Sequence, residues 1–198
     1  GQVRLINWNL NMGDGSFTYF AYVQVSDKKD LMLFNLQDKS ENIENPENVE
    51  LTDKNWFGAL YYKILTNQAG KNTYYTLLGW DGHNDFTNRK LVETFYISGK
   101  KIFFGPGIFK MEKSVKNRLV FEYAEQAKMM LRYDEKLKMI VFDHLAPSQK
   151  KLEGQFMFYG PDMSHDGLIF KDGFWEFRAN LDLRNLEDPK VKNLEKSF

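Results

Sequence analysis

Short stretches in which hydrophobic and polar residues alternate recur along almost the whole chain, and Gly, Asp or Asn ends most of them. In residues 17–25, the hydrophobic side chains stand at every second position: Phe17, Tyr19, Ala21, Val23 and Val25. Successive side chains of a β-strand point to opposite faces, so this spacing gathers all five on one face. The pattern predicts a strand with one buried and one solvent-facing side.

Turn sequences of hairpin length separate most of these stretches. Ser98-Gly99-Lys100 separates 91–97 from 101–104, and Asp172-Gly173 separates 169–171 from 174–177. Short connections of this kind join antiparallel neighbours, whereas parallel strands need crossovers of about a dozen residues or more. The other predicted strands are 3–10, 31–36, 56–65, 73–82, 118–123, 130–133 and 139–142.

About a dozen strands do not remain one flat sheet in a single domain. We therefore expect an all-β, mainly antiparallel fold, arranged as a two-sheet sandwich or a barrel-like structure. A small propeller is the alternative, although no side-chain signature repeats at a fixed period. Residues 1–185 are expected to form a single domain, followed by a charged C-terminal tail at 186–198. Residues 122–130 and this tail are the two helix candidates.

Residues 38–55 interrupt the strand pattern. Acidic residues occupy every third position there: Asp38, Glu41, Glu44, Glu47, Glu50 and Asp53. Pro46 argues against one continuous helix, because proline removes a backbone donor and clashes with the preceding turn. The segment is interpreted as a solvated connection with one helical turn, and a cation-attracting or partner-binding loop is the alternative.

Composition removes several classes of function. The 27 basic and 27 acidic residues cancel, so no overall field favours nucleic acid as a partner. The chain has no cysteine, which excludes disulfides, thiolate nucleophiles and cysteine-ligated zinc. No apolar stretch approaches the roughly 18 residues that indicate a membrane-spanning segment. Neither the oligomeric state nor the cellular compartment follows from these features.

The candidate chemistry lies in aspartates and histidines near turn-forming residues. The candidate ligand-binding residues are Trp80, Asp81, His83, Asp85, Asp143, His144, Asp162 and His165. Imidazole and carboxylate groups suit acid–base catalysis, ligand binding or a divalent metal, while Asp also hydrogen-bonds its own turn. No metal-binding spacing, nucleophile elbow or phosphate loop accompanies them, so we expect neither a metal nor a cofactor. Trp80 could provide an apolar platform beside Asp81.

Asp143 and His144 follow the hydrophobic stretch 139–142 and precede Leu145-Ala146-Pro147. This placement predicts an ionisable pair where a buried strand emerges into a turn. Asp143 is expected to accept hydrogen bonds from backbone amides of that turn. The alternative is that its carboxylate orients His144 by bonding one ring nitrogen.

Several motifs resemble an uncharacterised family of bacterial, apparently extracytoplasmic proteins of unknown function. They are residues 74–82 (YYTLLGWDG), 131–135 (LRYDE), 140–148 (IVFDHLAPS) and 158–162 (FYGPD), and 3–9 resembles the opening of the same region. The resemblance implies a longer native protein with a leader upstream, but it supplies no activity. We expect a non-catalytic extracytoplasmic binding or interaction module, for a glycan or other small ligand. A hydrolase that uses loop carboxylates and histidine is the alternative.

Overall fold

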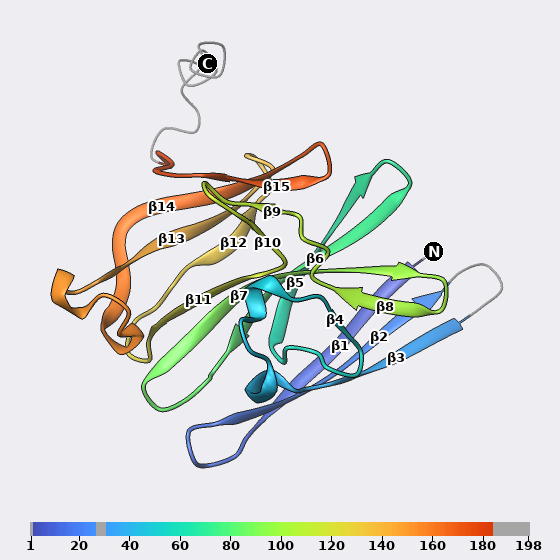
Figure 1. Ribbon diagram of the computed structural model, residues 1–198, viewed down its shortest axis with the longest axis horizontal. Helices are drawn as coiled ribbons and strands as arrows, with labels where there is room; N and C mark the ends of the chain where they lie inside the picture. Colours follow the sequence, from blue (N-terminus) through green and yellow to red (C-terminus); the bar gives the residue numbers. More distant parts are fainter. Residues whose placement is uncertain (1, 27–30, 184–198) are drawn as a thin grey trace, which may run out of the picture.

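The computed structural model describes residues 2–26 and 31–183, whose strands form three sheets (Figure 1). The N-terminal sheet has the order β1-β2-β3: β1 (Gln2–Asn11), β2 (Phe17–Ser26) and β3 (Leu31–Gln37). The middle sheet has the order β4-β8-β7-β6-β5: β4 (Leu51–Thr52), β5 (Leu60–Ala69), β6 (Asn72–Asp81), β7 (Thr87–Ser98) and β8 (Lys101–Phe104). Strand β11 (Leu119–Ala124) also pairs with β7.

The C-terminal sheet has the order β10-β9-β15-β14-β13-β12. Its strands are β9 (Phe109–Lys110), β10 (Val115–Lys116), β12 (Leu131–Asp134), β13 (Met139–Pro147), β14 (Tyr159–Lys171) and β15 (Phe174–Arg178). Among the described strands, only β9 and β15 pair in parallel. The predicted all-β, mainly antiparallel, sandwich- and barrel-like fold is therefore confirmed, and the propeller alternative is wrong.

The N-terminal sheet shows the expected alternation along β2. Tyr19, Ala21, Val23 and Val25 are buried, and the residues between them face outward. This sheet also joins the edge strand β5, because the Asn7 side chain bonds both backbone groups of Tyr61. The pairing of β5 with β6 shifts register between Tyr61 and Lys63. Asn7 thus satisfies backbone groups at an irregularity in the middle sheet.

The middle sheet is buried on both faces, which explains the consecutive hydrophobic residues of β6 and β7. Leu77 and Leu91 pack in a cluster with the N-terminal sheet, while Leu78 and Val92 pack in a second cluster with the C-terminal sheet. Neighbouring residues of one strand point to opposite faces, so a strand covered on both sides needs an unbroken apolar run. In Figure 1 the middle sheet accordingly lies between the other two.

Trp175 joins the C-terminal sheet to the middle sheet. Its side chain is buried, its ring packs edge-on against Phe170, and its Nε1 donates a 2.9 Å hydrogen bond to Thr76 Oγ1. Thr76 Oγ1 also lies 3.0 Å from Thr94 Oγ1. A tryptophan that is buried with its indole N–H satisfied contributes both packing area and a specific orientation.

A buried ion pair lies on the opposite face of the middle sheet. Arg118 Nε donates to Glu93 Oε2 at 2.7 Å, and neither side chain is exposed. Burial raises the pKa of Glu93, and the Arg118 guanidinium opposes that rise. Arg118 Nη1 also donates to the carbonyl oxygens of Pro46 and Val49. The pair therefore fastens the segment after β3 to the core.

Two interpretations of local structure need correction. Residues 122–130, a helix candidate, continue strand β11 to Ala124 and then turn, because Leu119–Ala124 pairs with β7 along its whole length. Segment 38–55 holds two 3₁₀ helices, η1 (Ser40–Asn42) and η2 (Pro46–Asn48), rather than one helical turn. The tail at 186–198 lies outside the described residues.

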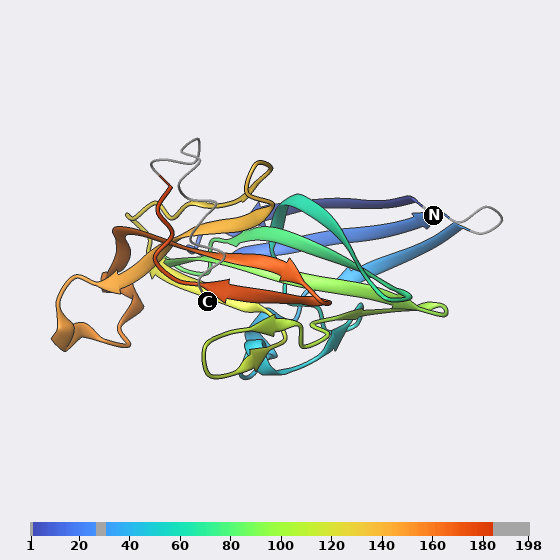
Figure 2. The ribbon, with the colours of Figure 1, turned by 90° about the horizontal axis from the view of Figure 1, so that it is seen from above.

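The other two 3₁₀ helices are η3 (Lys150–Leu152) and η4 (Phe156–Phe158), between β13 and β14. This segment projects at the opposite end of the molecule from the start of β1 (Figure 2). Within residues 2–26 and 31–183, no helix has the length and apolar character needed to cross a membrane.

Candidate functional site

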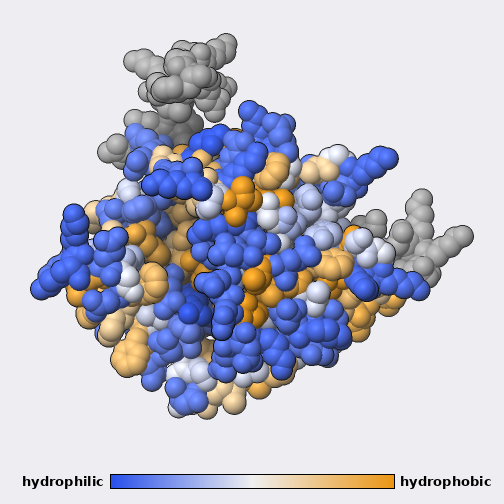
Figure 3. Space-filling model, viewed as in Figure 1, coloured by the Kyte–Doolittle hydropathy of each residue, from blue (hydrophilic) through white to orange (hydrophobic). Residues whose placement is uncertain are grey.

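A cleft of about 550 Å3 lies where the start of β2, the η1–η2 segment, the end of β6 and the start of β7 meet. Polar residues that line it include Tyr19, Asp38, Asp81, His83 and Arg89, and its hydrophobic lining includes Phe17, Ile43 and Phe57. We refer to this site as the polar cleft. Figure 3 shows hydrophilic residues over the η1–η2 segment that forms one wall.

Asp38 holds that wall in place. Its Oδ1 accepts hydrogen bonds from the Ser40 backbone amide and hydroxyl and from the Gly58 amide, at 3.0, 2.5 and 3.2 Å. Its Oδ2 accepts one from the Tyr19 amide at 3.2 Å. These bonds fill the lone-pair sites of Oδ1 and one of the two on Oδ2. Asp38 therefore positions the cleft wall, and its Oδ2 can accept one more hydrogen bond.

Asp81 lies at the base of the cleft and keeps one oxygen less occupied. Its Oδ1 accepts hydrogen bonds from the Tyr19 hydroxyl and the His83 amide, both at 3.0 Å. Its Oδ2 lies 3.7 Å from Arg89 Nη1. Burial raises the pKa of Asp81, and Arg89 opposes the rise. Burial and the neighbouring Asp81 charge also raise the pKa of Tyr19.

Arg89 connects Asp81 to a second carboxylate, Glu122, which lines a neighbouring pocket and not the polar cleft. Arg89 Nε donates to Glu122 Oε2 at 2.9 Å, and Thr87 Oγ1 donates to Glu122 Oε1 at the same distance. His83 Nε2 lies 3.9 Å from Glu122 Oε1. Burial and Arg89 lower the pKa of His83, against the effect of Glu122. His83 is therefore a neutral imidazole at neutral pH, able to donate or accept.

A second group of predicted residues lies on the C-terminal sheet. His144 Nδ1 lies 2.7 Å from Asp166 Oδ2, and His165 Nε2 lies 3.4 Å from Asp143 Oδ1. Asp143 and His165 are directly paired across β13 and β14, where the register shifts between Asp143 and Leu145. These two imidazole–carboxylate pairs come from adjacent strands rather than from turns.

The expected roles of Asp143 and His144 need correction accordingly. Strand β13 runs through both residues to Pro147, because β14 continues to pair with it beyond the register shift. Asp143 Oδ2 accepts a 2.7 Å hydrogen bond from the Met130 amide, which belongs to another segment and not to a following turn. Asp143 faces His165, and Asp166 rather than Asp143 lies against His144.

We expect Asp143→Ala to lower the free energy of unfolding by about 1–3 kcal/mol, because the partly buried Met130 amide loses its acceptor. His144→Ala should cost less than about 1 kcal/mol, since the ring is half exposed and its ion pair is screened. Urea unfolding of the two variants measures both values. Equal losses in the two variants would contradict the structural role assigned to Asp143.

The remaining predicted residues occupy separate positions. Asp162 lies within β14, where its Oδ1 accepts hydrogen bonds from the Ser164 hydroxyl and amide, and these bonds lower its pKa. Asp85 is exposed and lies against Gly15. Trp80 packs edge-on against Phe17, with ring centroids 5.3 Å apart, so it supports a residue of the polar cleft.

Of the predicted residues, only Asp81 and His83 line the polar cleft. Sequence reasoning missed Tyr19, Asp38 and Arg89, and also Glu122, which bonds to Arg89. One signal for Arg89 was present, because a hairpin between β6 and β7 places it directly opposite Asp81. Among the described residues, no three His, Asp or Glu side chains are arranged to hold a metal ion.

Comparison with known proteins adds no relative to this description. No family model and no curated protein matches the sequence significantly, and no solved structure matches the fold significantly.

Proposed function

We propose that the protein is a binding module that holds a small polyhydroxylated ligand, such as a glycan, in the polar cleft. The supporting observation is the rigid, mixed lining of that cleft. Asp81 Oδ2 can accept a hydrogen bond, and the neutral His83 ring can donate or accept one. Phe17 and Ile43 add apolar surface. Sugars present alternating hydroxyl groups and C–H faces, which such a combination complements.

Binding without catalysis is supported by the hydrogen bonds that the two serine hydroxyls of the cleft make. The Ser16 hydroxyl donates to Asp14 Oδ1 and the Ser40 hydroxyl donates to Asp38 Oδ1, each at 2.5 Å. Neither hydroxyl is bonded to His83, so no nucleophile and base are paired in the cleft. The carboxylates of Asp38 and Asp81 hold backbone and side-chain donors, which suits a preorganised binding site.

A hydrolase remains the second candidate, because one cleft contains two groups with shifted protonation. The pKa of Asp81 is raised and that of His83 is lowered. Groups shifted in this way are common where acid–base chemistry occurs. Release of reducing sugar from a bound glycan, abolished by Asp81→Asn, would support the hydrolase. Stable binding without any product supports the binding module.

The location outside the cytoplasm belongs to the same proposal. It rests on the resemblance of residues 74–82, 140–148 and 158–162 to apparently extracytoplasmic bacterial proteins. Fractionation of cells that produce the native protein tests it, and recovery in the cytoplasmic fraction would contradict it.

Thermal unfolding in the presence of glycans, metal ions and lipids tests the proposed ligand class, because binding to the native state raises the melting temperature. A glycan should stabilise the wild-type protein and lose at least about ten-fold in affinity with His83→Ala. His165→Ala is the matched control, since the two rings are 31% and 30% exposed. Stabilisation by lipids or metal ions alone, or an effect of His165→Ala only, would contradict the proposal.

A further inference from the structure

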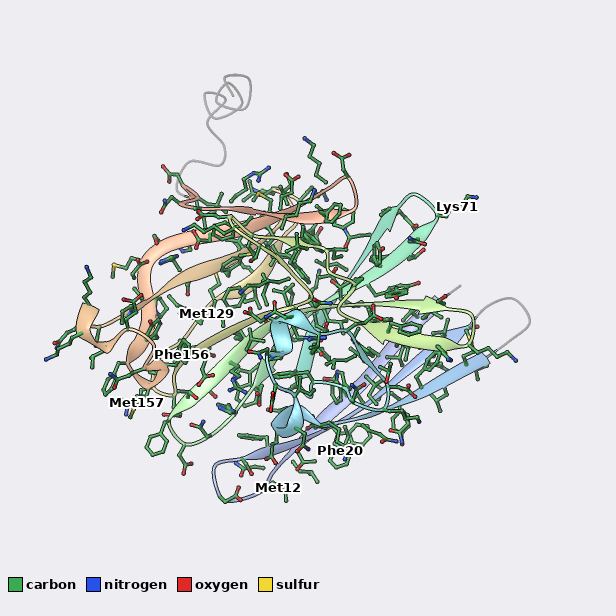
Figure 4. All side chains as sticks on the ribbon, in the orientation of Figure 1. Met12, Phe20, Lys71, Met129, Phe156 and Met157 are labelled. Carbon is green, nitrogen blue, oxygen red and sulfur yellow. The ribbon has the colours of Figure 1, made fainter. Side chains whose placement is uncertain are left out.

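The outer face of the N-terminal sheet is the most hydrophobic exposed surface of the described residues. Six large apolar side chains on it are exposed: Ile6 53%, Trp8 41%, Leu10 53%, Phe20 37%, Leu31 66% and Leu33 61%. We name these six residues the outer apolar face. Figure 3 shows hydrophobic atoms along the lower margin, where β1–β3 lie, and Figure 4 shows Phe20 and the adjacent Met12 pointing away from the core.

The strand register places the exposed apolar residues of β1 and β2 side by side. Trp8 stands directly opposite Phe20, and Ile6 stands opposite Tyr22. The Trp8 ring stacks on the rings of both Phe20 and Tyr22, with centroids 5.5 Å and 6.1 Å apart. Leu33 and Leu31 of β3 share this outward face, where they stand opposite the polar residues Gln24 and Ser26 of β2. Solvent-facing sheet sides are usually polar, so this arrangement calls for a partner.

The area of the outer apolar face suits a stable interface. A large side chain covers roughly 150–250 Å2, and exposed fractions of 37–66% leave on the order of 100 Å2 on each of the six. The sum of roughly 600 Å2 is at the upper limit for monomeric proteins. With the polar residues of the same face, it approaches the ~800 Å2 that each partner buries in a typical stable complex.

Charge and ring geometry favour a second copy of the chain as the occupant. Among the outward positions of β1–β3 that the structure describes, Arg4 is the one charged residue, and it lies near the start of β1. A two-fold interface places each surface against itself, which a neutral centre permits and a charged centre opposes. The ring of Trp8 is stacked on its neighbours, so it offers little free face to a sugar.

We propose that the outer apolar face is a homodimer interface, in which two N-terminal sheets pack face to face about a two-fold axis. Sheets pack in this way about 10 Å apart, with apolar side chains interdigitating. The polar cleft is lined by a different set of residues, so the dimer and the proposed ligand are independent.

Sedimentation velocity of the full chain, from low to high micromolar concentration, tests this proposal. The wild-type protein should sediment with twice the monomer mass. Ile6→Lys and Leu33→Lys should each raise the dimer dissociation constant at least about 100-fold, because each places two like charges in one apolar interface. Val115→Lys is the matched control, since Val115 and Ile6 are both strand residues that are 53% exposed.

Circular dichroism of the Lys variants should match the wild-type spectrum, because both positions are exposed, while their melting temperature should lose the dependence on protein concentration that a dimer shows. A wild-type chain that is monomeric at every concentration would overturn the proposal. A dimer that survives both Ile6→Lys and Leu33→Lys uses another surface and would also overturn it. Open-ended polymers, or a complex with a different protein in place of self-association, would exclude the closed homodimer.

Discussion

Arg118→Met should lower the free energy of unfolding by about 3–5 kcal/mol, because it leaves the buried Glu93 carboxylate without a counter-charge. The carbonyl oxygens of Pro46 and Val49 also lose a donor. For a domain of this length, the loss corresponds to a fall in melting temperature of roughly 6–20 °C. Chemical denaturation at neutral pH, analysed as a two-state transition, measures the effect.

The free energy of unfolding that Arg118→Met loses should depend on pH. Burial raises the folded-state pKa of Glu93 above its ordinary 4.5, so the folded protein holds this proton more tightly than the unfolded chain and loses stability as pH rises through that pKa. Removing Arg118 raises the pKa further. The deficit of Arg118→Met relative to wild type should therefore be smaller at pH 5 than at pH 8, and adding Glu93→Leu should recover part of it.

Lys116→Met provides the matched control for the Arg118 prediction. Lys116 pairs with Glu47 at 2.5 Å, and both side chains are partly exposed. A screened pair of this kind contributes about 0–1 kcal/mol. If Arg118→Met and Lys116→Met destabilised the protein equally, the buried Arg118–Glu93 pair would not hold the segment after β3 to the core.

Trp175→Ala should cost about 3–5 kcal/mol, because it empties a buried indole site between the C-terminal and middle sheets. Trp175→Phe keeps most of the packing but leaves Thr76 without its indole donor, and should cost about 1–2 kcal/mol. Guanidinium unfolding followed by circular dichroism measures both. A loss below about 1 kcal/mol for Trp175→Ala would mean that the two sheets do not depend on this contact.

The local features of the fold were predictable from the sequence. The alternation in residues 17–25 identified β2 and its buried face, and Asp172-Gly173 identified the turn between β14 and β15. These features depend on neighbouring residues only. The consecutive residues Leu77 and Leu78 pack in two different clusters, and periodicity could not show that two different sheets cover the faces of this strand.

The polar cleft depends on contacts between distant parts of the chain. Tyr19 bonds to Asp81 across 62 positions, and Asp38 bonds to the Gly58 amide across 20. The pairing of His144 with Asp166 follows from the alignment of β13 and β14. A histidine that precedes or follows an aspartate in sequence points to the opposite face of a strand, so adjacency gave the wrong partner.

Backbone amide chemical shifts, recorded as a stabilising glycan is added, test the central claim most directly. They report where the ligand binds as well as whether it binds. We predict the largest shift changes in residues 16–19, 38–46 and 81–89, around the polar cleft. His83→Ala should reduce these changes. Changes confined to residues 143–166, or to the outer apolar face, would contradict the assignment of the polar cleft as the binding site.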